Sequence, residues 1–497
     1  MIFRDKRLLF FDTSGIESLH NVTLTMNPPL KRGACVHLEK EWEIDALRPS
    51  SIVRWDGEYR LYCRVKIGDT GALAFLTSSD GIEWTRPDLG VVEFAGSKRN
   101  NLVDMQGLSP DEICVFVDPT GPDEHRFKMI LHRPFEGTFL MTSPDGLRFK
   151  RAPGLLLKHH TDNHMSAFWD EEAGCYRIYL RGGDRSRPVP PARGGRMVVL
   201  AETDDLFKPL PVRENPPDPW EHGMWRPDAD GMPIRPLPPI NRELPKVLAM
   251  DELDPPEADL YQAAAVHYCP GVYFAFPTLY FHYPSPPEGF INDGTLDLQF
   301  AASRGGVLWQ RSFRGSYVRL DLPGGPCSKQ MHMLMGVIPG ERTLQQYHVG
   351  SERTHGQDRT PQNPKPHFQP QLGQPAVFRV EQRMDGFVSA DSGYEGGRLV
   401  TAPFQIGAPQ LRINIDTSAS GEAHAALLDE KGWEIPGFGL EDSDRIQTND
   451  TAHVLTWKRS ADVSSLAGRP VRLLLKSRGA KLFAVYPEDP NPTGEAF

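Results

Sequence analysis

The sequence predicts an all-β chain, organised as a five-bladed β-propeller followed by a C-terminal β-sandwich. Helical periodicity is almost absent, and short runs rich in Val, Ile, Tyr, Phe and Trp alternate with Asp-Gly, Gly-Gly and Pro turns, a pattern typical of β-strands. The 497 residues include 45 glycines and 46 prolines, and so many turn-forming residues interrupt helices and favour short strands. A recurring phrase then indicates a repeat architecture rather than a single sheet.

The propeller is predicted from this repeat. The phrase that closes each strand–turn–strand unit reads SDGIEW at 79–84, PDGLRF at 144–149 and RGGVLW at 304–309. Strands of one kind lie before or between these phrases, at 59–64, 127–132, 176–181 and 272–277, and the last recurrence lies at 331–349. About five units result, and their spacing suits four-stranded blades of ~40–50 residues that loops have lengthened.

The repeat predicts the domain boundaries. Residues 1–355 would form the propeller, and the polar stretch 356–375, rich in Pro and Gln, would form a linker because it cannot bury enough apolar surface to fold alone. Residues 376–497 have alternating strands with a turn every few residues, which favours a β-sandwich. We expect the sandwich to support the propeller rather than to bind a ligand itself.

The charge and the N-terminus limit the classes of partner. The formal net charge of −10 argues against nucleic acid or an anionic membrane as the main partner, since both attract basic surfaces. The sequence has no apolar run long enough to span a membrane and opens without a secretory leader, so we expect a cytoplasmic protein, or a secreted one if the sequence given has been trimmed. Nothing in the sequence indicates an oligomeric state.

A resemblance to a known group of enzymes follows from three features. These are the segment PSSIVRWDGEYRLY at 49–62, the SxDGxxW closures and the terminal sandwich. Together they resemble the five-bladed β-propeller glycoside hydrolases of the invertase/levanase and arabinanase types. The resemblance implies a funnel at the propeller axis, walled by the first residues of each innermost strand, where carboxylates cleave a furanoside or related glycoside.

The chain departs from that resemblance in its first blade. Where those enzymes have Asp-Pro before the strand that leads to Gly-Glu-Tyr, this sequence has Arg48-Pro49, so a cation replaces the usual nucleophile or base. The sequence is more similar to a divergent group of bacterial glycosyl-hydrolase-like proteins, through the opening LFFD at 9–12 and the segments 163–170 and 259–261. The similarity to that group therefore implies no particular activity for this chain.

The repeat itself predicts which residues face the funnel. Aligning Trp169 of the third unit with Trp55 of the first places Asp162 in the register of Arg48. In the fourth unit Tyr261 takes this register, and Asp259 lies two residues away on the same strand face. In the second unit the wall residue is Asp111 or Glu112.

Two carboxyl groups are needed to cleave a glycoside, one protonated and one ionised. We expect Asp162 and Asp259 to form this pair, with Asp111 as a third catalytic candidate. Apposed carboxylates beside a cation have their pKa values pushed apart, and Arg48 would hold its neighbour ionised. The candidates for binding the sugar are Arg48, His164, Tyr261, His282 and Asp45.

Two other functions stay open. A His, Tyr and Arg group also suits a polysaccharide lyase, in which Tyr or His removes the proton beside a uronate carboxylate that Arg neutralises. A non-catalytic propeller that only binds sugar is the third reading, favoured by the lost first-blade Asp.

The sequence indicates no cofactor. His160 and His164 have the spacing of a helical metal-binding pair but lie in an all-β context, so we expect no metal there.

Overall fold

The computed structural model describes residues 7–44, 47–67, 70–110, 112–133, 136–159, 161, 165–183, 195–212, 244–284, 292–357 and 371–488. Within these ranges the only helical elements are three single 3₁₀ turns, η1 (Glu41–Glu43), η2 (Asp123–His125) and η3 (Ser464–Leu466). The rest of the regular structure is antiparallel sheet, which confirms the all-β prediction.

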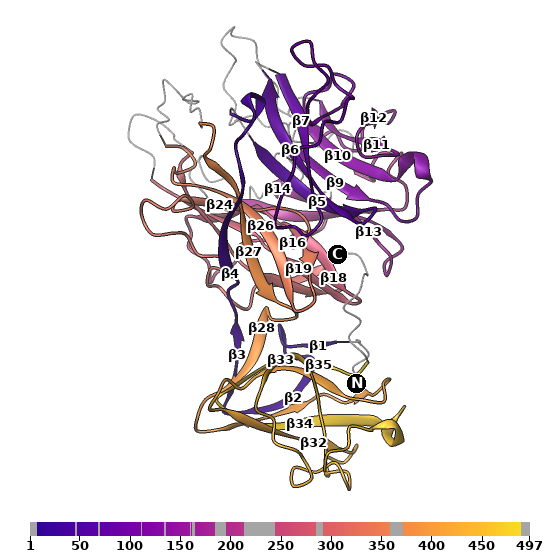
Figure 1. Cartoon of the computed structure of the whole chain (residues 1–497), viewed down its shortest axis with the longest axis vertical. Coiled ribbons are helices and arrows are strands. Elements are labelled where there is room, and N and C mark those ends of the chain that lie inside the picture. Colours follow the sequence, from indigo (N-terminus) through magenta and orange to yellow (C-terminus); the bar gives the residue numbers. More distant parts are fainter. Residues whose placement is uncertain are drawn as a thin grey trace.

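Three four-stranded sheets follow one another along the chain and lie in the upper part of Figure 1. The first contains β5 (Arg48–Trp55), β6 (Glu58–Ile67), β7 (Thr70–Ser78) and β8 (Leu102–Val103); the second contains β9 (Glu112–Val117), β10 (Phe127–Arg133), β11 (Gly137–Ser143) and β12 (Lys150–Arg151); the third contains β13 (Ser166–Asp170), β14 (Cys175–Gly183), β15 (Arg196–Thr203) and β16 (Lys246–Leu248). In each, strands that are consecutive in sequence pair as neighbours.

The next segment forms two short sheets, because its strands are interrupted around Ala263 and Ala264. One contains β17 (Ala258–Gln262), β20 (Thr278–His282) and β21 (Gly294–Leu298), and the other contains β18 (Ala265–Cys269), β19 (Val272–Ala275), β22 (Ala301–Arg304) and β23 (Leu308–Gln310). A further sheet joins β24 (Gln330–Met333), β25 (Ile338–Pro339), β26 (Thr343–Ser351) and β27 (Pro375–Arg383) to the early strand β4 (Leu30–His37).

The first strands of these units contact one another in a closed circle. The contacts are Val115 N to Ser51 Oγ (3.0 Å), Ala167 N to Cys114 Sγ (3.3 Å), Ala265 N to Ser166 Oγ (2.9 Å), Gln262 Nε2 to the Met333 carbonyl (2.7 Å) and Ile52 N to the Met335 carbonyl (2.9 Å). The β5 strand and Met335 run parallel. The heads of β5, β9, β17 and β24 therefore face the same end of this circle.

A tyrosine on one unit holds the turn of the next. The Tyr62 hydroxyl donates to the Gly146 carbonyl (3.1 Å) and the Tyr179 hydroxyl to the Gly306 carbonyl (2.8 Å), and Tyr347 makes the same contact with Gly81. These glycines lie in the three phrases in which the sequence showed a repeat. Each adopts a positive φ, between 73° and 76°, a backbone conformation that glycine adopts without strain.

Replacing Gly146 with alanine is expected to destabilise the fold by roughly 2–4 kcal/mol. A Cβ at this position would overlap the Tyr62 hydroxyl and lie 3.0 Å from the Phe127 ring, in addition to the strain of a φ of +76°. Gly154→Ala is the matched control, because its φ is +83° and nothing lies within 4 Å of its Cβ. Thermal unfolding of both variants checks this, and equal losses would contradict the tyrosine contact as the cause.

The C-terminal strands form two further sheets, in the lower part of Figure 1, and both include N-terminal strands. One joins β28 (Val388–Ser392), β31 (Arg412–Asp416), β33 (Asn449–Val454) and β35 (Ala480–Tyr486) to β1 (Leu8–Leu9) and β3 (Val22–Met26); the other joins β29 (Gly397–Thr401), β30 (Phe404–Gln405), β32 (Glu422–Leu428) and β34 (Pro470–Arg478) to β2 (Ile16–His20).

These pairings cross the boundaries expected from the sequence. Strands β1 to β3 were expected in the domain 1–355 but pair with C-terminal strands, and β27 was expected in the domain 376–497 but pairs with β26 and β4. The linker expected at 356–375 lies largely outside the described residues. A boundary taken from composition alone missed these pairings because the register between distant strands is not visible in local sequence.

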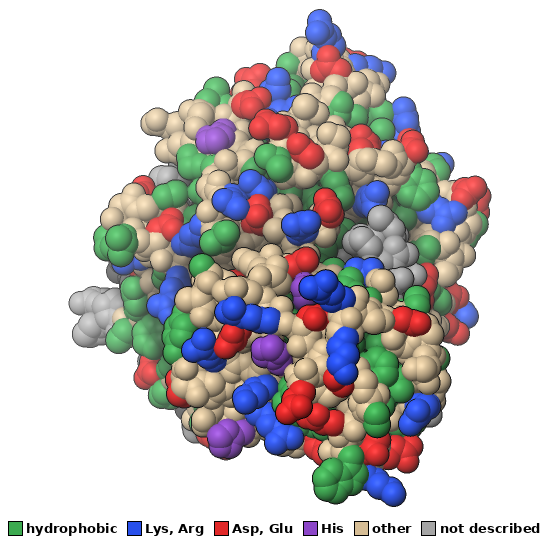
Figure 2. Space-filling model, turned by 60° about the horizontal axis from the view of Figure 1, so that its bottom comes forward, with side chains coloured by type: hydrophobic (Ala, Val, Ile, Leu, Met, Phe, Trp, Pro, Cys, Tyr) green, Lys and Arg blue, Asp and Glu red, His purple; other side chains and the backbone are tan. Residues whose placement is uncertain are grey.

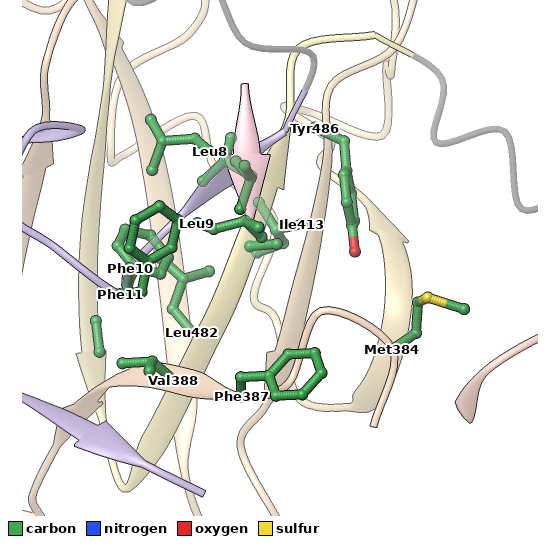
Figure 3. Close-up of a cluster of buried hydrophobic side chains, with 14 of the residues drawn as sticks. Leu8, Leu9, Phe10, Phe11, Met384, Phe387, Val388, Ile413, Leu482 and Tyr486 are labelled. Atoms are coloured by element: carbon green, nitrogen blue, oxygen red, sulfur yellow. The ribbon is translucent and has the colours of Figure 1, made fainter. Parts of the chain in front are cut away.

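One continuous apolar cluster packs the two parts of the chain together. Figure 3 shows Leu8, Leu9, Phe10 and Phe11 beside Phe387, Val388, Ile413 and Leu482. The same cluster extends to Phe274 and Phe300, whose rings lie 4.7 and 5.5 Å from that of Phe387. At its edge the buried Asp385 accepts hydrogen bonds from Tyr268 and Tyr486 (both 2.7 Å) and pairs with Arg7 (3.1 Å).

The exposed face of the C-terminal sheets is mixed in charge. Figure 2 shows acidic and basic side chains interspersed on the face that it presents. Such a surface lacks the single sign of charge that attracts nucleic acid. No helix in the described ranges is long and apolar enough to cross a lipid bilayer.

Candidate functional site

Asp259 lies at the centre of a buried polar cluster at the head of β17. Only 2% of its surface is exposed. Its Oδ2 accepts hydrogen bonds from Arg196 Nη1 (2.7 Å) at the start of β15 and from His282 Nε2 (3.0 Å) at the end of β20. The antiparallel pairing of β17 with β20 brings the head of one strand beside the end of the other, so residues distant in sequence meet here.

The cluster keeps Asp259 ionised. Burial alone would raise the pKa of its carboxyl group, but the Arg196 guanidinium and the hydrogen bond from His282 outweigh burial and lower this pKa below its ordinary value. The same contact acts on Arg196, because Asp259 raises the pKa of the guanidinium against the effect of burial. The pair is therefore a buried ion pair at neutral pH, and Asp259 cannot serve there as a proton donor.

Asp259 Oδ1 and Arg196 Nε are buried and have no hydrogen-bond partner among the residues that the structure describes. Leaving a buried carboxylate oxygen without a donor costs free energy. A buried carboxylate oxygen that lacks a donor is suited to accept a hydrogen bond from a ligand hydroxyl or to contact a reacting atom.

Aromatic rings enclose the ion pair. The Arg196 guanidinium carbon lies 5.4 Å from the centre of the Tyr261 ring and 5.5 Å from that of Tyr280, and Tyr280 packs on His282 at 3.9 Å. A second guanidinium, that of Arg181, lies 5.9 Å from the Tyr261 ring. Burial raises the pKa of the Tyr280 hydroxyl. Among the nearby charges, Arg196 lowers this pKa and Asp259 and Asp293 raise it, each by less than burial does.

Tyr261 also belongs to a chain of hydrogen bonds that leads away from Asp259. Its hydroxyl lies 3.1 Å from His355 Nε2, and His355 Nδ1 lies 3.1 Å from the Asn292 carbonyl oxygen. The His332 ring lies 5.3 Å from the Tyr261 ring on a third element, β24. Two imidazoles and two guanidiniums thus surround one half-buried tyrosine.

The structure brings together three of the residues that the sequence singled out. Asp259, Tyr261 and His282 lie in this cluster, and Asp259 and Tyr261 both contact Arg196. Arg48 is exposed at the start of β5, and within the described residues the guanidinium that pairs with Asp259 is that of Arg196. The expected cation beside Asp259 is thus Arg196, not Arg48. The other four candidates, Asp45, Asp111, Asp162 and His164, lie outside the described residues.

Three residues of the cluster were missed as site residues from sequence. They are Arg196, Tyr280 and His355. The signal that could have found Arg196 is its position as the first residue of the strand-forming run RMVVLAET at 196–203. This position places it at the same end of the sheet as the heads of the first strands.

Glu112, the alternative to Asp111, opens β9 and lies 4.0 Å from Arg64 Nη1. This carboxylate is at the same end of the circle of first strands as Asp259. Like Asp259 it lies at the head of one of the strands in the circle, and its pairing with arginine repeats the arrangement at Asp259.

A surface hollow lies elsewhere, where the two parts of the chain meet. It has a volume of about 300 Å³ and is lined by residues that include Leu30, Arg342, Glu381 and Arg383. The ionic groups there are already paired, since Glu381 accepts from Arg32 and Arg383 donates to Asn414 and Asn449. The hollow therefore offers no reactive group comparable to Asp259. In the described ranges no cluster of three or more His, Cys, Asp or Glu side chains is arranged to hold a metal ion.

Comparisons with known proteins give distant similarities. No protein-family model matches the sequence, and no curated protein matches it. Among solved structures the chain is similar to an N-acetylgalactosamine deacetylase from F. plautii in complex with blood group B trisaccharide, at 12% identity over 73% of this chain and 96% of that one, with a TM-score of 0.43.

Two further similarities are to an exo-inulinase from Aspergillus awamori (8% identity, 91% of this chain and 98% of that one, TM-score 0.39) and to an α-L-arabinofuranosidase from Podospora anserina in complex with cellotriose (10% identity, 71% and 97%, TM-score 0.36). The resemblance to propeller-type glycoside hydrolases that the sequence indicated is found again here. Likeness at this level does not assign an activity or a substrate to this chain.

Proposed function

We propose that this chain cleaves glycosidic bonds, with Asp259 as the ionised carboxylate of its active site. The observation that carries the proposal is the state of Asp259. It is a buried, ionised carboxylate held by Arg196 and His282 through one oxygen, and its other oxygen has no hydrogen-bond partner within the described part of the chain. Glycoside cleavage requires an ionised carboxylate beside the anomeric carbon. The Tyr261 ring beside it is partly exposed and is suited to pack against a sugar ring.

The proposal includes the architecture that places Asp259. The circle of first-strand contacts supports five blades around one axis, with β24 to β27 and β4 forming the last blade. The two C-terminal sheets support a sandwich that begins after Arg383 and takes in strands β1 to β3 within residues 7–26. Asp259 then lies at the mouth of the axis. Asp162, expected as the second carboxylate, stays a prediction, as do Asp111, His164 and Asp45.

The test is turnover by the full chain on a panel of glycosides. The panel contains aryl arabinofuranosides, fructofuranosides, xylosides and mannosides, since the expected substrate is a furanoside or related sugar, together with the corresponding oligosaccharides. Release of the aryl group, and of reducing sugar from the oligosaccharides, is the expected result for at least one sugar. Ligand-induced thermal stabilisation without turnover on any member of the panel would instead indicate a protein that only binds sugar.

A uronate lyase is the second candidate, and the contact between Tyr261 and His355 favours it. A tyrosine with an imidazole partner and arginines beside its ring can remove a proton next to a carboxylate that arginine neutralises. Lyase products carry a double bond that absorbs in the ultraviolet, whereas hydrolysis creates no such chromophore. Incubation with uronate-containing glycans, followed by absorbance, therefore distinguishes the two reactions.

A further inference from the structure

The hydrogen bonds of His355 fix its role toward Tyr261. A backbone carbonyl only accepts hydrogen bonds, so His355 Nδ1, 3.1 Å from the Asn292 carbonyl, carries a proton. In the neutral ring Nε2 then has a lone pair and accepts the hydrogen bond of the Tyr261 hydroxyl across 3.1 Å. In the protonated ring Nε2 donates to the same tyrosine oxygen instead. One proton on His355 therefore decides whether Tyr261 is free to donate its own proton or to accept one.

Tyr261 and Asp259 are placed to act on the same ligand. They are two residues apart on β17, and Tyr261 lies where the pairing of β17 with β20 shifts register between Leu260 and Gln262. Both contact Arg196, Asp259 by an ion pair and Tyr261 through its ring face. The guanidiniums of Arg196 and Arg181 over this ring stabilise negative charge on the phenol oxygen. Tyr261 is also half-exposed, whereas Asp259 is buried.

We propose that Tyr261 and His355 form the acid/base pair of the site, in which Tyr261 exchanges a proton with the glycosidic oxygen and His355 supplies and recovers that proton. The inference rests on the proposed glycoside cleavage and names the group that performs its proton transfer. The arrangement has three parts: a side chain that transfers the proton, a base within hydrogen-bond reach of it, and a third group that orients the base. Here these are Tyr261, His355 and the Asn292 carbonyl.

The reaction balances in two steps. In the first, Asp259 Oδ1 bonds to the anomeric carbon, and the glycosidic C–O bond breaks with its electron pair left on the departing oxygen. That oxygen takes the Tyr261 proton, and Tyr261 takes the Nε2 proton of protonated His355. In the second, water attacks the anomeric carbon as the bond to Asp259 breaks, its proton passes to Tyr261, and the proton of Tyr261 returns to His355. Water is the only reactant added, and the anomeric configuration is retained.

The charged and titratable groups around the pair come from every element packed on it. They are Arg181 on β14, Arg196 on β15, Asp259 on β17, Tyr280 and His282 on β20, Asp293 before β21, and His332 on β24. The first step needs protonated His355. The rate on substrates that require an acid therefore falls as pH rises through the titration of this histidine.

The experiment compares leaving groups in the Tyr261→Phe variant. The sugar that the full chain cleaves best is presented as two glycosides. The leaving group of the dinitrophenyl glycoside departs without being protonated, whereas the leaving group of the methyl glycoside must be protonated to depart. We expect kcat/KM to fall by roughly 10²–10³-fold on the methyl glycoside and to change little on the dinitrophenyl glycoside. Tyr273→Phe is the matched control, because Tyr273 also has a hydrogen-bonded hydroxyl, an arginine 5.1 Å from its ring and a stacked histidine.

His355→Gln provides a second measurement that does not depend on Tyr261→Phe. Glutamine can still donate a hydrogen bond to Tyr261 but does not titrate, so the alkaline limb of kcat/KM on the methyl glycoside is expected to move to higher pH. Equal losses on both glycosides in Tyr261→Phe, or an alkaline limb unchanged in His355→Gln, would overturn the acid/base pair alone. A full chain that cleaves no glycoside would overturn the proposed function, and this inference with it.

Discussion

Replacing Asp259 with asparagine is expected to lower kcat by roughly 10⁴-fold or more, because it removes the group on which the proposed chemistry depends. Asparagine has nearly the same volume and can still accept a hydrogen bond from Arg196 or His282, but it carries no negative charge. It can neither attack the anomeric carbon nor stabilise the positive charge that develops there. Steady-state kinetics on the aryl glycoside that the chain cleaves best measures the loss.

The control for Asp259→Asn is Asp170→Asn. Asp170 is also buried and lies at the opposite end of a first strand. It accepts a hydrogen bond from Tyr273 (2.6 Å) and forms an ion pair with Arg177 (3.0 Å). Both variants remove the charge of a buried aspartate beside an arginine, so both are expected to lower stability. Only Asp259→Asn should abolish turnover. Activity in Asp259→Asn within a factor of ten of the wild type would remove Asp259 from the mechanism.

The ionisation of Asp259 also sets an expectation for pH. Arg196 and His282 lower the pKa of this carboxyl below its ordinary value of 3.8. A group that must be ionised to act loses activity only as pH falls through its own pKa. The fall of kcat/KM in acid that is due to Asp259 should therefore have its midpoint below pH 3.8, and a fall with its midpoint well above this value would have to come from another group.

Replacing Asp385 with alanine is expected to reduce the free energy of unfolding by about 3–5 kcal/mol, the cost of breaking a buried charged network. The carboxylate accepts hydrogen bonds from Tyr268 and Tyr486 and pairs with Arg7. Its loss leaves two buried hydroxyls and a largely buried guanidinium without their acceptor. Because Tyr268 and Tyr486 come from different parts of the chain, the change weakens the junction between them.

Asp56→Ala is the control for the backbone at this position. Asp385 has a φ of 53° and Asp56 a φ of 51°, but Asp56 is exposed at a turn. Alanine pays a similar conformational cost at both, so the difference in thermal or denaturant unfolding reports the buried contacts alone. If Asp385→Ala lost no more stability than Asp56→Ala, the carboxylate network would have no role in holding the junction.

The sequence predicts local features well, because they depend on neighbouring residues. The all-β class and the turns at 79–84, 144–149 and 304–309 follow from strand-forming runs and Asp-Gly or Gly-Gly pairs. The aspartates of the first two phrases each cap their own turn, with Ile82 N and Leu147 N donating to Asp80 and Asp145. Such contacts need no knowledge of the rest of the fold.

The polar cluster shows why the remainder could not be predicted. Asp259 and Tyr261 were found because they share one strand, and His282 because it stands in an aromatic strand. Arg196 was not found, because 63 residues separate it from Asp259 and only sheet pairing brings them together. The choice between Arg48 and Arg196 as the partner cation depends on side-chain direction at strand ends, which repeat alignment does not resolve.

The pairing of the strands within residues 7–37 with both parts of the chain has a consequence for synthesis. Strands β1 to β3 pair with strands that are synthesised late, near the C-terminal end of the chain. Strand β4 likewise pairs with the later strand β27. Neither part can complete all of its sheets while the later strands are still being translated. A gene cut near position 376 would give two fragments, each with a strand edge that has lost its partner. Both parts of the chain therefore complete their sheets only after the strands from β27 to β35 have been synthesised.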